Sequence, residues 1–131
     1  MPREIYIYNS IMTTDSAILV NQGVPAAATI DDLPNEVTDD TISLTWSEPE
    51  SNGKEITQYT VYQRIVADGK PREWKELKII TDVSDRELTV NLESGKVYEF
   101  VVTATNEFGE SLKEDGKITR VKASESMFYV V

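Results

Sequence analysis

The chain has 131 residues, of which 40% are apolar and 27% are charged, and such a composition is typical of a soluble protein with one globular domain. Its net charge of −10 disfavours binding to nucleic acid or anionic lipid, because both would repel it. Cysteine and histidine are absent, which excludes disulfides, zinc–thiolate sites, a Ser-His-Asp triad and most transition-metal sites. No apolar run reaches the roughly 20 residues of a membrane helix, and the first residues lack the apolar core of a signal peptide.

Residues 1–28 form an N-terminal extension with its own strand signals. Arg3–Asn9 is rich in β-branched and aromatic residues and predicts a strand. Ser16–Val20 predicts a second, shorter strand, and Val24–Ala28 is expected to be an extended linker. Two interpretations stay open: the extension is the tail of a preceding domain, or it is a hairpin that extends or exchanges a sheet.

Two strands are predicted after this extension. The first falls near Ala28–Ile30, or in a broken form through Leu33–Asn35, where proline suits a sheet edge because it cannot donate to a ladder. The second is Thr41–Trp46, which alternates between apolar and polar residues as a half-buried strand does. Its inward residues are Ile42, Leu44 and Trp46.

Three further segments continue the β pattern. A strand is predicted from about Ile56 to Val66, and the Asp68-Gly69 pair that follows favours a hairpin turn. The segment Glu73–Ile80 predicts an edge strand, and Arg86–Leu92 predicts another strand. The inward residues of these segments include Tyr59, Val61, Leu88, Val90 and Leu92.

The stretch Leu92–Gly109 carries the clearest pattern in the chain. It opens with the turn Glu93–Gly95, continues as a long alternating run, and ends in the turn Asn106–Gly109. One side carries Tyr98, Phe100, Val102 and Ala104, and the other carries Glu99, Val101, Thr103 and Thr105. This alternation predicts a half-buried strand whose apolar face is covered by a second sheet. A last strand is expected through Ser111–Lys113 and Lys117–Lys122, broken at Asp115-Gly116.

The order and spacing of these segments resemble the fibronectin type III family. In that resemblance Tyr98 is the corner tyrosine, whose hydroxyl bonds to a backbone acceptor near Leu92–Ser94. Thr41–Trp46 is the strand that carries the core tryptophan, and Pro49–Gly53 is the turn after it. The family often has proline where this chain has Ser94, and Gln63 stands in the place of a second tyrosine.

The resemblance implies an all-β fold, an antiparallel sandwich of seven strands in two sheets with an immunoglobulin-like topology. It covers residues 29–124, so that residues 1–28 precede the domain and residues 125–131 form an apolar C-terminal tail. The predicted core comprises Ile42, Leu44, Trp46, Tyr59, Val61, Leu88, Val90, Leu92, Tyr98, Phe100, Val102 and Ala104.

Few residues suggest a chemical site. The carboxylates Asp31, Asp32, Glu36, Asp39 and Asp40 could supply oxygen ligands for calcium, but their spacing fits no calcium-binding loop, and a solvated loop is the simpler interpretation. No catalytic motif is present, so we expect no enzyme activity, cofactor or metal. The candidates for partner binding are Trp74 and the turn residues Glu107, Phe108 and Glu110. For Trp74 the simpler interpretation is packing against the long side chains of Arg64, Arg72 and Lys75, and an exposed anchor for a partner is the alternative.

The resemblance implies a non-enzymatic protein-interaction and spacer module of a multidomain cell-surface, adhesion or matrix protein. Two alternatives remain: a module of a cytoplasmic or sarcomeric scaffold, and an accessory spacer or carbohydrate-binding module of a secreted enzyme. The location is then extracellular or at the cell surface in the first case and cytoplasmic in the second. The partners are neighbouring domains and other proteins. The acidity of the chain has two interpretations: it serves solubility, which is the simpler one, or it attracts a partner with a basic surface or calcium.

Both ends of the chain carry apolar segments of high β propensity, Ile5–Tyr8 and Phe128–Val131. Unpaired strand-forming segments recruit other chains. A homodimer that pairs through these terminal strands is therefore a further hypothesis.

Overall fold

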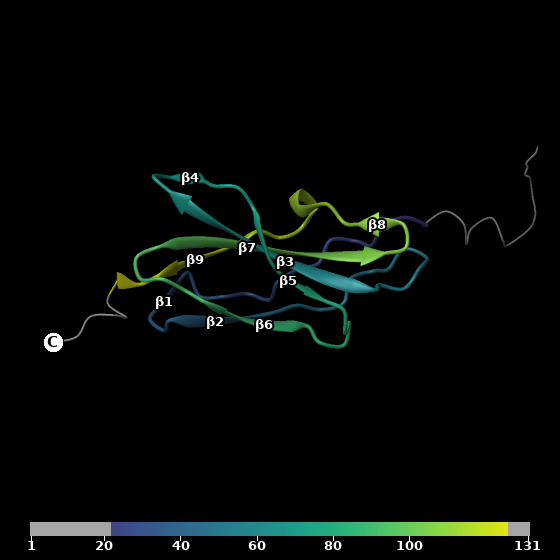
Figure 1. Cartoon of the computed structure of the whole chain (residues 1–131), viewed down its shortest axis with the longest axis horizontal. Coiled ribbons are helices and arrows are strands. Elements are labelled where there is room, and N and C mark those ends of the chain that lie inside the picture. The colour runs from purple at the N-terminus through teal and green to yellow at the C-terminus, as the bar shows by residue number, and fades with distance from the viewer. Residues whose placement is uncertain (1–21, 126–131) are drawn as a thin grey trace, which may run out of the picture.

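Two β-sheets pack face to face in the computed structural model, which describes residues 22–125 (Figure 1). The larger sheet has the strand order β1-β9-β7-β3-β4, with β5 beside β3 and β8 beside β7, and the smaller sheet pairs β2 with β6. This arrangement confirms the predicted all-β sandwich. The strands are β1 (Glu36–Val37), β2 (Thr41–Thr45), β3 (Gln58–Ala67), β4 (Lys70–Pro71), β5 (Lys75–Ile80), β6 (Glu87–Asn91), β7 (Val97–Asn106), β8 (Gly109–Glu110) and β9 (Thr119–Ala123).

The first strand takes the broken form that its proline suggested. Ile30 forms an isolated antiparallel bridge with Trp46 beside the small sheet. The chain then crosses to the large sheet, where β1 pairs in parallel with β9 through Glu36 and Lys122. Pro34 lies between the two pairings, where no ladder hydrogen bond is required of it.

The core fills the space between the sheets. Eleven of the twelve predicted core residues are buried, and Leu88 is partly buried and packs against the others. The Trp46 ring meets the Tyr59 ring edge to face, with centroids 5.7 Å apart. Tyr98 and Phe100 stack with their planes 8° apart. Packing of this kind supplies the stability of a domain whose sequence has no disulfide.

Two turns follow from local chemistry. Asp68 and Gly69 both have positive φ, 55° and 74°, as a two-residue turn between twisted antiparallel strands requires, and they join β3 to β4. The corner tyrosine bonds near the expected place, but in the opposite sense. The Glu93 backbone N–H donates to the Tyr98 hydroxyl at 2.7 Å, so the hydroxyl is the acceptor in this bond.

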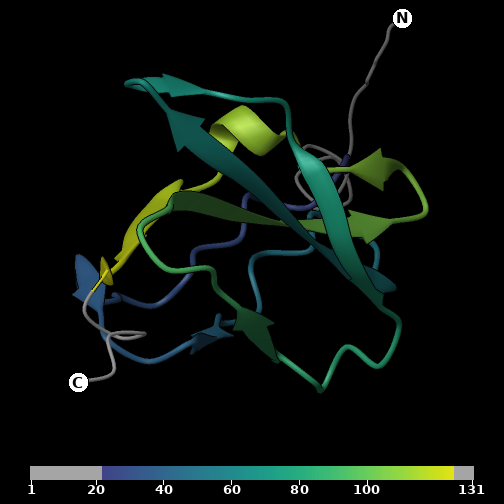
Figure 2. The same ribbon diagram turned by 60° about the vertical axis from the view of Figure 1, so that its left-hand side comes forward.

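The outer face of β7 differs from the sequence prediction, because β7 is buried on both faces. Glu99, Val101 and Thr103 were expected on a solvated face, yet each is at most 6% exposed. The cover includes the segment 111–118, which was predicted to begin the last strand. Instead it contains the 3₁₀ turn η2 (Lys113–Asp115), which lies on the side of β7 away from β2 and β6 (Figures 1 and 2).

One glycine allows this segment to lie close to β7. A Cβ atom at Gly116 would stand 2.8 Å from the Val101 Cγ2 atom, closer than real side chains approach. The backbone of 111–118 therefore packs directly on the strand, and the last strand is confined to β9. No helix within residues 22–125 is long and apolar enough to cross a membrane. The strands predicted at Arg3–Asn9, Ser16–Val20 and Phe128–Val131 lie outside the described residues.

Candidate interaction surfaces

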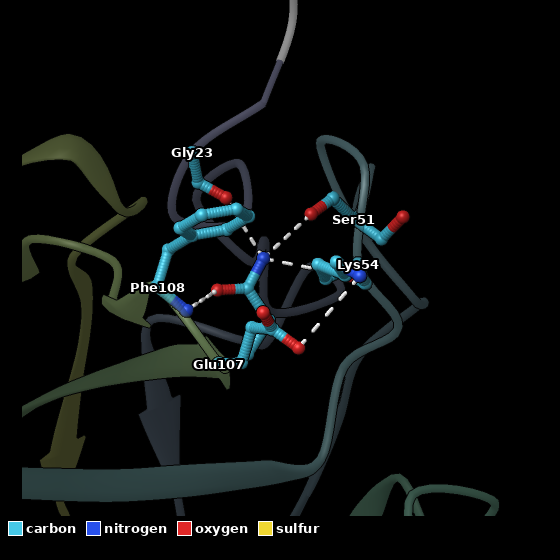
Figure 3. Close-up of polar contacts among 6 residues, drawn as sticks. Gly23, Ser51, Lys54, Glu107 and Phe108 are labelled. Carbon is cyan, nitrogen blue, oxygen red and sulfur yellow. Dashed lines mark hydrogen bonds and ion pairs between the residues drawn. The ribbon is translucent and has the colours of Figure 1, made fainter. Parts of the chain in front are cut away.

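One end of the sandwich joins three loops that are distant in sequence. They are the segment that enters the domain near Gly23, the loop 50–54 between β2 and β3, and the turn 106–109 after β7 (Figure 3). We call this end the loop pole. Its centre is Asn106, the last residue of β7, which is 3% exposed.

The Asn106 side chain ties these loops together through its amide. Its Nδ2 donates to the carbonyl oxygens of Gly23 and Ser51, each at 2.8 Å, with a longer contact of 3.4 Å to that of Lys54. Its Oδ1 accepts the backbone N–H of Phe108 at 2.8 Å. A buried amide needs partners for both its donors and its acceptor, and this one finds them on three separate segments.

Two of the four candidate partner-binding residues are exposed on the loop pole. Phe108 is 45% exposed, while its backbone N–H is held by the buried Asn106 side chain. Glu107 forms an ion pair with Lys54 across the pole, with 3.9 Å between Oε1 and Nζ. Both side chains of that pair are about half exposed or more, so the pair adds little stability.

Glu110 is also exposed, but its carboxylate is bound by side chains of the large sheet. Its Oε2 accepts hydrogen bonds from the Tyr62 hydroxyl at 2.6 Å and from Thr103 Oγ1 at 2.5 Å. Burial, together with the hydrogen bond to Glu110, raises the pKa of Tyr62 to about 12. Lys113 places its ammonium 4.2 Å from the centre of the same ring. The contacts of Glu110 therefore favour a structural role over partner binding.

Trp74 also packs within the fold, as the simpler interpretation predicted. It is half-buried, and the Arg64 guanidinium lies 4.1 Å from the centre of its ring. Arg64 Nε also donates to Glu99 Oε1 at 2.8 Å, while Arg120 donates to Glu99 Oε2 through two nitrogens, at 2.8 and 3.0 Å. Burial alone would raise the pKa of Glu99, but the hydrogen bonds from the two arginines outweigh it and hold that pKa below its usual value.

The acidic cluster does not gather into a metal site. Its five residues are all exposed: Glu36 lies in β1, and the other four lie in the loops on either side of it. Asp31 accepts a hydrogen bond from the Thr45 hydroxyl, and Asp32 pairs with Lys117 at 2.6 Å, which lowers the pKa of Asp32. Nowhere in residues 22–125 do three or more carboxylates converge as a metal would require.

Sequence reasoning missed the central residue of the loop pole. Asn106 was interpreted only as part of the turn Asn106–Gly109, because asparagine and glycine are both common turn residues. Its partners are backbone carbonyls of Gly23, Ser51 and Lys54, which have no side-chain signature. The available signal was its position at the end of an alternating strand, at the point where a side chain turns inward under the loops.

Comparison with known proteins places this fold in a family. The family model described as fibronectin type III domain matches residues 31–121, and the chain belongs to that family. It is 32% identical over 111 residues to a titin homolog of Caenorhabditis elegans, covering 79% of this chain and a share of that protein that rounds to 0%. It is also 32% identical over 109 residues to contactin-1 of Gallus gallus, covering 77% of this chain and 10% of that protein.

Solved structures agree with this assignment. The titin kinase with its flanking domains matches at 26% identity and a TM-score of 0.56, over 80% of this chain and 18% of that one. The twitchin kinase region from C. elegans has the same fold at 23% identity and a TM-score of 0.58, over 84% of this chain and 18% of that one. The chain thus spans a small part of the proteins it matches, and it is a module of the type found in titin-like and contactin-like proteins.

Proposed function

We propose that the chain is a non-enzymatic protein-interaction and spacer module of a multidomain protein. Support comes from the family membership and from the small share of each relative that the chain covers. The described segment also enters the sandwich at one end of its long axis and leaves at the other (Figure 1). A module with this geometry suits serial connection to neighbours.

The contact surface is the exposed part of the loop pole, Glu107 and Phe108. The observation that carries this assignment is the half-exposed Phe108 ring, whose backbone is fixed by the Asn106 Oδ1 atom. A rigid exposed aromatic residue loses little conformational freedom on binding, which is the property of interface anchors.

The distribution of charge supports a partner with a basic surface. The segments 31–55 and 82–93, which contain β2, β6 and their loops, carry twelve carboxylates against Lys54 and Arg86. The segment 58–80, which contains β3 and β5, has more bases than acids. The acidic side of the sandwich would therefore attract and orient a basic partner, in a manner that weakens with added salt.

We propose a cell-surface, adhesion or matrix protein as the parent, and a cytoplasmic or sarcomeric scaffold as the second candidate. Contactin-1 supports the first and the titin homolog supports the second, at equal identity. The compartment of the full-length parent protein, observed by imaging with an antibody to this module, distinguishes the two.

Site-specific photo-cross-linking tests the interaction surface. A photoreactive phenylalanine analogue is placed at position 108 in the full-length protein in its native cells, and at position 118 as the control. Ile118 is 40% exposed, close to the 45% of Phe108, but it precedes β9 away from the loop pole. A protein cross-linked from position 108 and not from position 118 supports the proposal. Equal products from both positions, or none from 108, would overturn it.

A further inference from the structure

The segment Gln22–Ala28 lies against the sandwich, although the sequence predicted only an extended linker at Val24–Ala28. The Gly23 N–H donates to the Asn52 carbonyl at 3.0 Å, and the Ala26 N–H donates to the Glu50 carbonyl at 2.8 Å. Pro25 and Ala28 are buried. These residues precede the family match, which begins at residue 31, so the folded unit extends upstream of the residues that define the family.

Side chains of the loop pole complete this attachment. Asn106 Nδ2 donates to the Gly23 carbonyl, and Asn52 Nδ2 donates to the Val24 carbonyl at 2.9 Å. Both the N–H groups and the carbonyls of the entering segment are therefore hydrogen-bonded to the loop pole. Asn106 differs from Asn52 because its buried amide also binds Ser51 and Phe108, so that it fixes both flanking loops at once.

Glycines on both flanking loops leave room for the segment. A Cβ atom at Gly53 would stand 2.8 Å from the Gln22 Cγ atom, and one at Gly109 would stand 3.3 Å from the Val24 Cγ1 atom. Both glycines have positive φ, 106° and 137°. The segment therefore packs against glycine backbone on either side of Asn106, with no space for a larger side chain at Gly53.

We infer that Asn106 is a positioning residue that docks Gln22–Ala28 on the sandwich and so fixes the direction from which the chain enters the module. The docking itself concerns this chain alone. The inference that it orients a neighbouring module rests on the proposed spacer function. A free linker lets a preceding module swing, whereas a docked segment transmits orientation across the junction. The loop pole is then a rigid junction as well as a contact surface.

Hydrogen exchange of the full chain tests the docking. The variant Asn106→Asp keeps the shape and the Oδ1 acceptor, removes the NH₂ donors and directs a charge at the carbonyls of Gly23 and Ser51. We expect the Gly23 and Ala26 amides to exchange about tenfold faster or more, with the central amides of β3 and β7 still protected. Asn52→Ala, which removes only the bond to Val24, should give a smaller increase.

Thr57→Val is the matched control. Thr57 donates its hydroxyl to the Thr105 carbonyl at 3.2 Å, beside Asn106, and not to the entering segment. It should leave Gly23 and Ala26 unchanged. Unchanged exchange of these two amides in Asn106→Asp, with a folded core, would overturn the inference.

A second measurement does not depend on the variant folding. Backbone ¹⁵N relaxation of the wild-type chain should give order parameters of about 0.85 at the amides of residues 23, 24 and 26–28, as in the strands, and values below about 0.6 would contradict docking. Both readouts use the isolated chain. A failure of cross-linking at Phe108 would therefore count against the proposed contact surface and leave the docking of Gln22–Ala28 unaffected.

Discussion

Arg64 and Glu99 lie directly opposite each other on β3 and β7, and Arg64 Nε donates to Glu99 Oε1 at 2.8 Å. Arg120 faces Glu99 from β9 on the other side. The three residues form a ladder across adjacent strands, with Trp74 stacked on Arg64 at its end. The central carboxylate is only 8% exposed, so the two arginines offset the cost of burying its charge.

Removing this carboxylate should destabilise the fold. Glu99→Ala leaves the guanidinium of Arg64, which is 20% exposed, without its acceptor. We expect a loss of about 1–3 kcal/mol in the free energy of unfolding, measured by urea denaturation. The control is Glu107→Ala, which removes the exposed pair with Lys54 and should cost about 0–1 kcal/mol. Equal midpoints for the two variants would contradict a structural role for the ladder.

The dependence of folding stability on pH should reflect the ionisation of Glu99. The pKa of Glu99 is lowered from its ordinary value of 4.5 in the folded state. The stabilisation that the Glu99 carboxylate gives the fold is therefore complete above the pKa of the unfolded state. It is lost as the pH falls through the lower pKa of the folded state. Between pH 7 and pH 3 the difference in urea midpoint between wild type and Glu99→Gln should shrink. Parallel curves across this range would show that Glu99 is not stabilised as a carboxylate.

The close approach of Gly116 to Val101 gives a steric prediction. In Gly116→Ala the new methyl group would stand 2.8 Å from Val101 Cγ2, at a backbone φ of −84° that alanine tolerates. The cost is therefore overpacking alone, and we expect a loss of about 1–3 kcal/mol. Gly23→Ala, where nothing lies within 4 Å of the added atom, is the matched control for thermal denaturation. A Gly116→Ala melting temperature equal to that of the control would refute the packing of 111–118 on β7.

The corner tyrosine should stabilise the turn before β7. Tyr98→Phe removes the oxygen that accepts the Glu93 N–H at 2.7 Å and leaves a partly buried donor unpaired. The expected loss is about 1–3 kcal/mol in urea denaturation. Hydrogen exchange of the Glu93 amide should also accelerate. Unchanged stability together with unchanged exchange at Glu93 would remove the assigned role of the hydroxyl.

The sequence predicted the sandwich and most of its core because period-two alternation encodes which residues face the opposite sheet. Ile42, Leu44 and Phe100 are buried where that alternation places them. It did not predict the outer cover of β7, because that cover depends on long-range contacts. Gly116, for example, packs against Val101 from a segment that lies beyond the turn after β7.

The sequence predicted only part of the candidate surface, again because local sequence does not specify long-range contacts. Glu107 and Phe108 lie exposed on a turn, as their sequence context suggested, whereas Glu110 and Trp74 are engaged by Tyr62 and Arg64. A turn residue's exposure follows from local chemistry. Whether a side chain on a strand or beside it is covered depends on its neighbours across the sheet, and local sequence does not specify those neighbours.

The interaction function is tested most directly by the affinity between the purified chain and the protein that cross-links from position 108. Calorimetric titration should show that Phe108→Ser weakens binding by about 2 kcal/mol or more, since anchors of this type dominate interface energetics. Ile118→Ser, with a side chain of similar exposure away from the loop pole, should bind as the wild type does. Equal affinities for Phe108→Ser and the wild type would contradict the account.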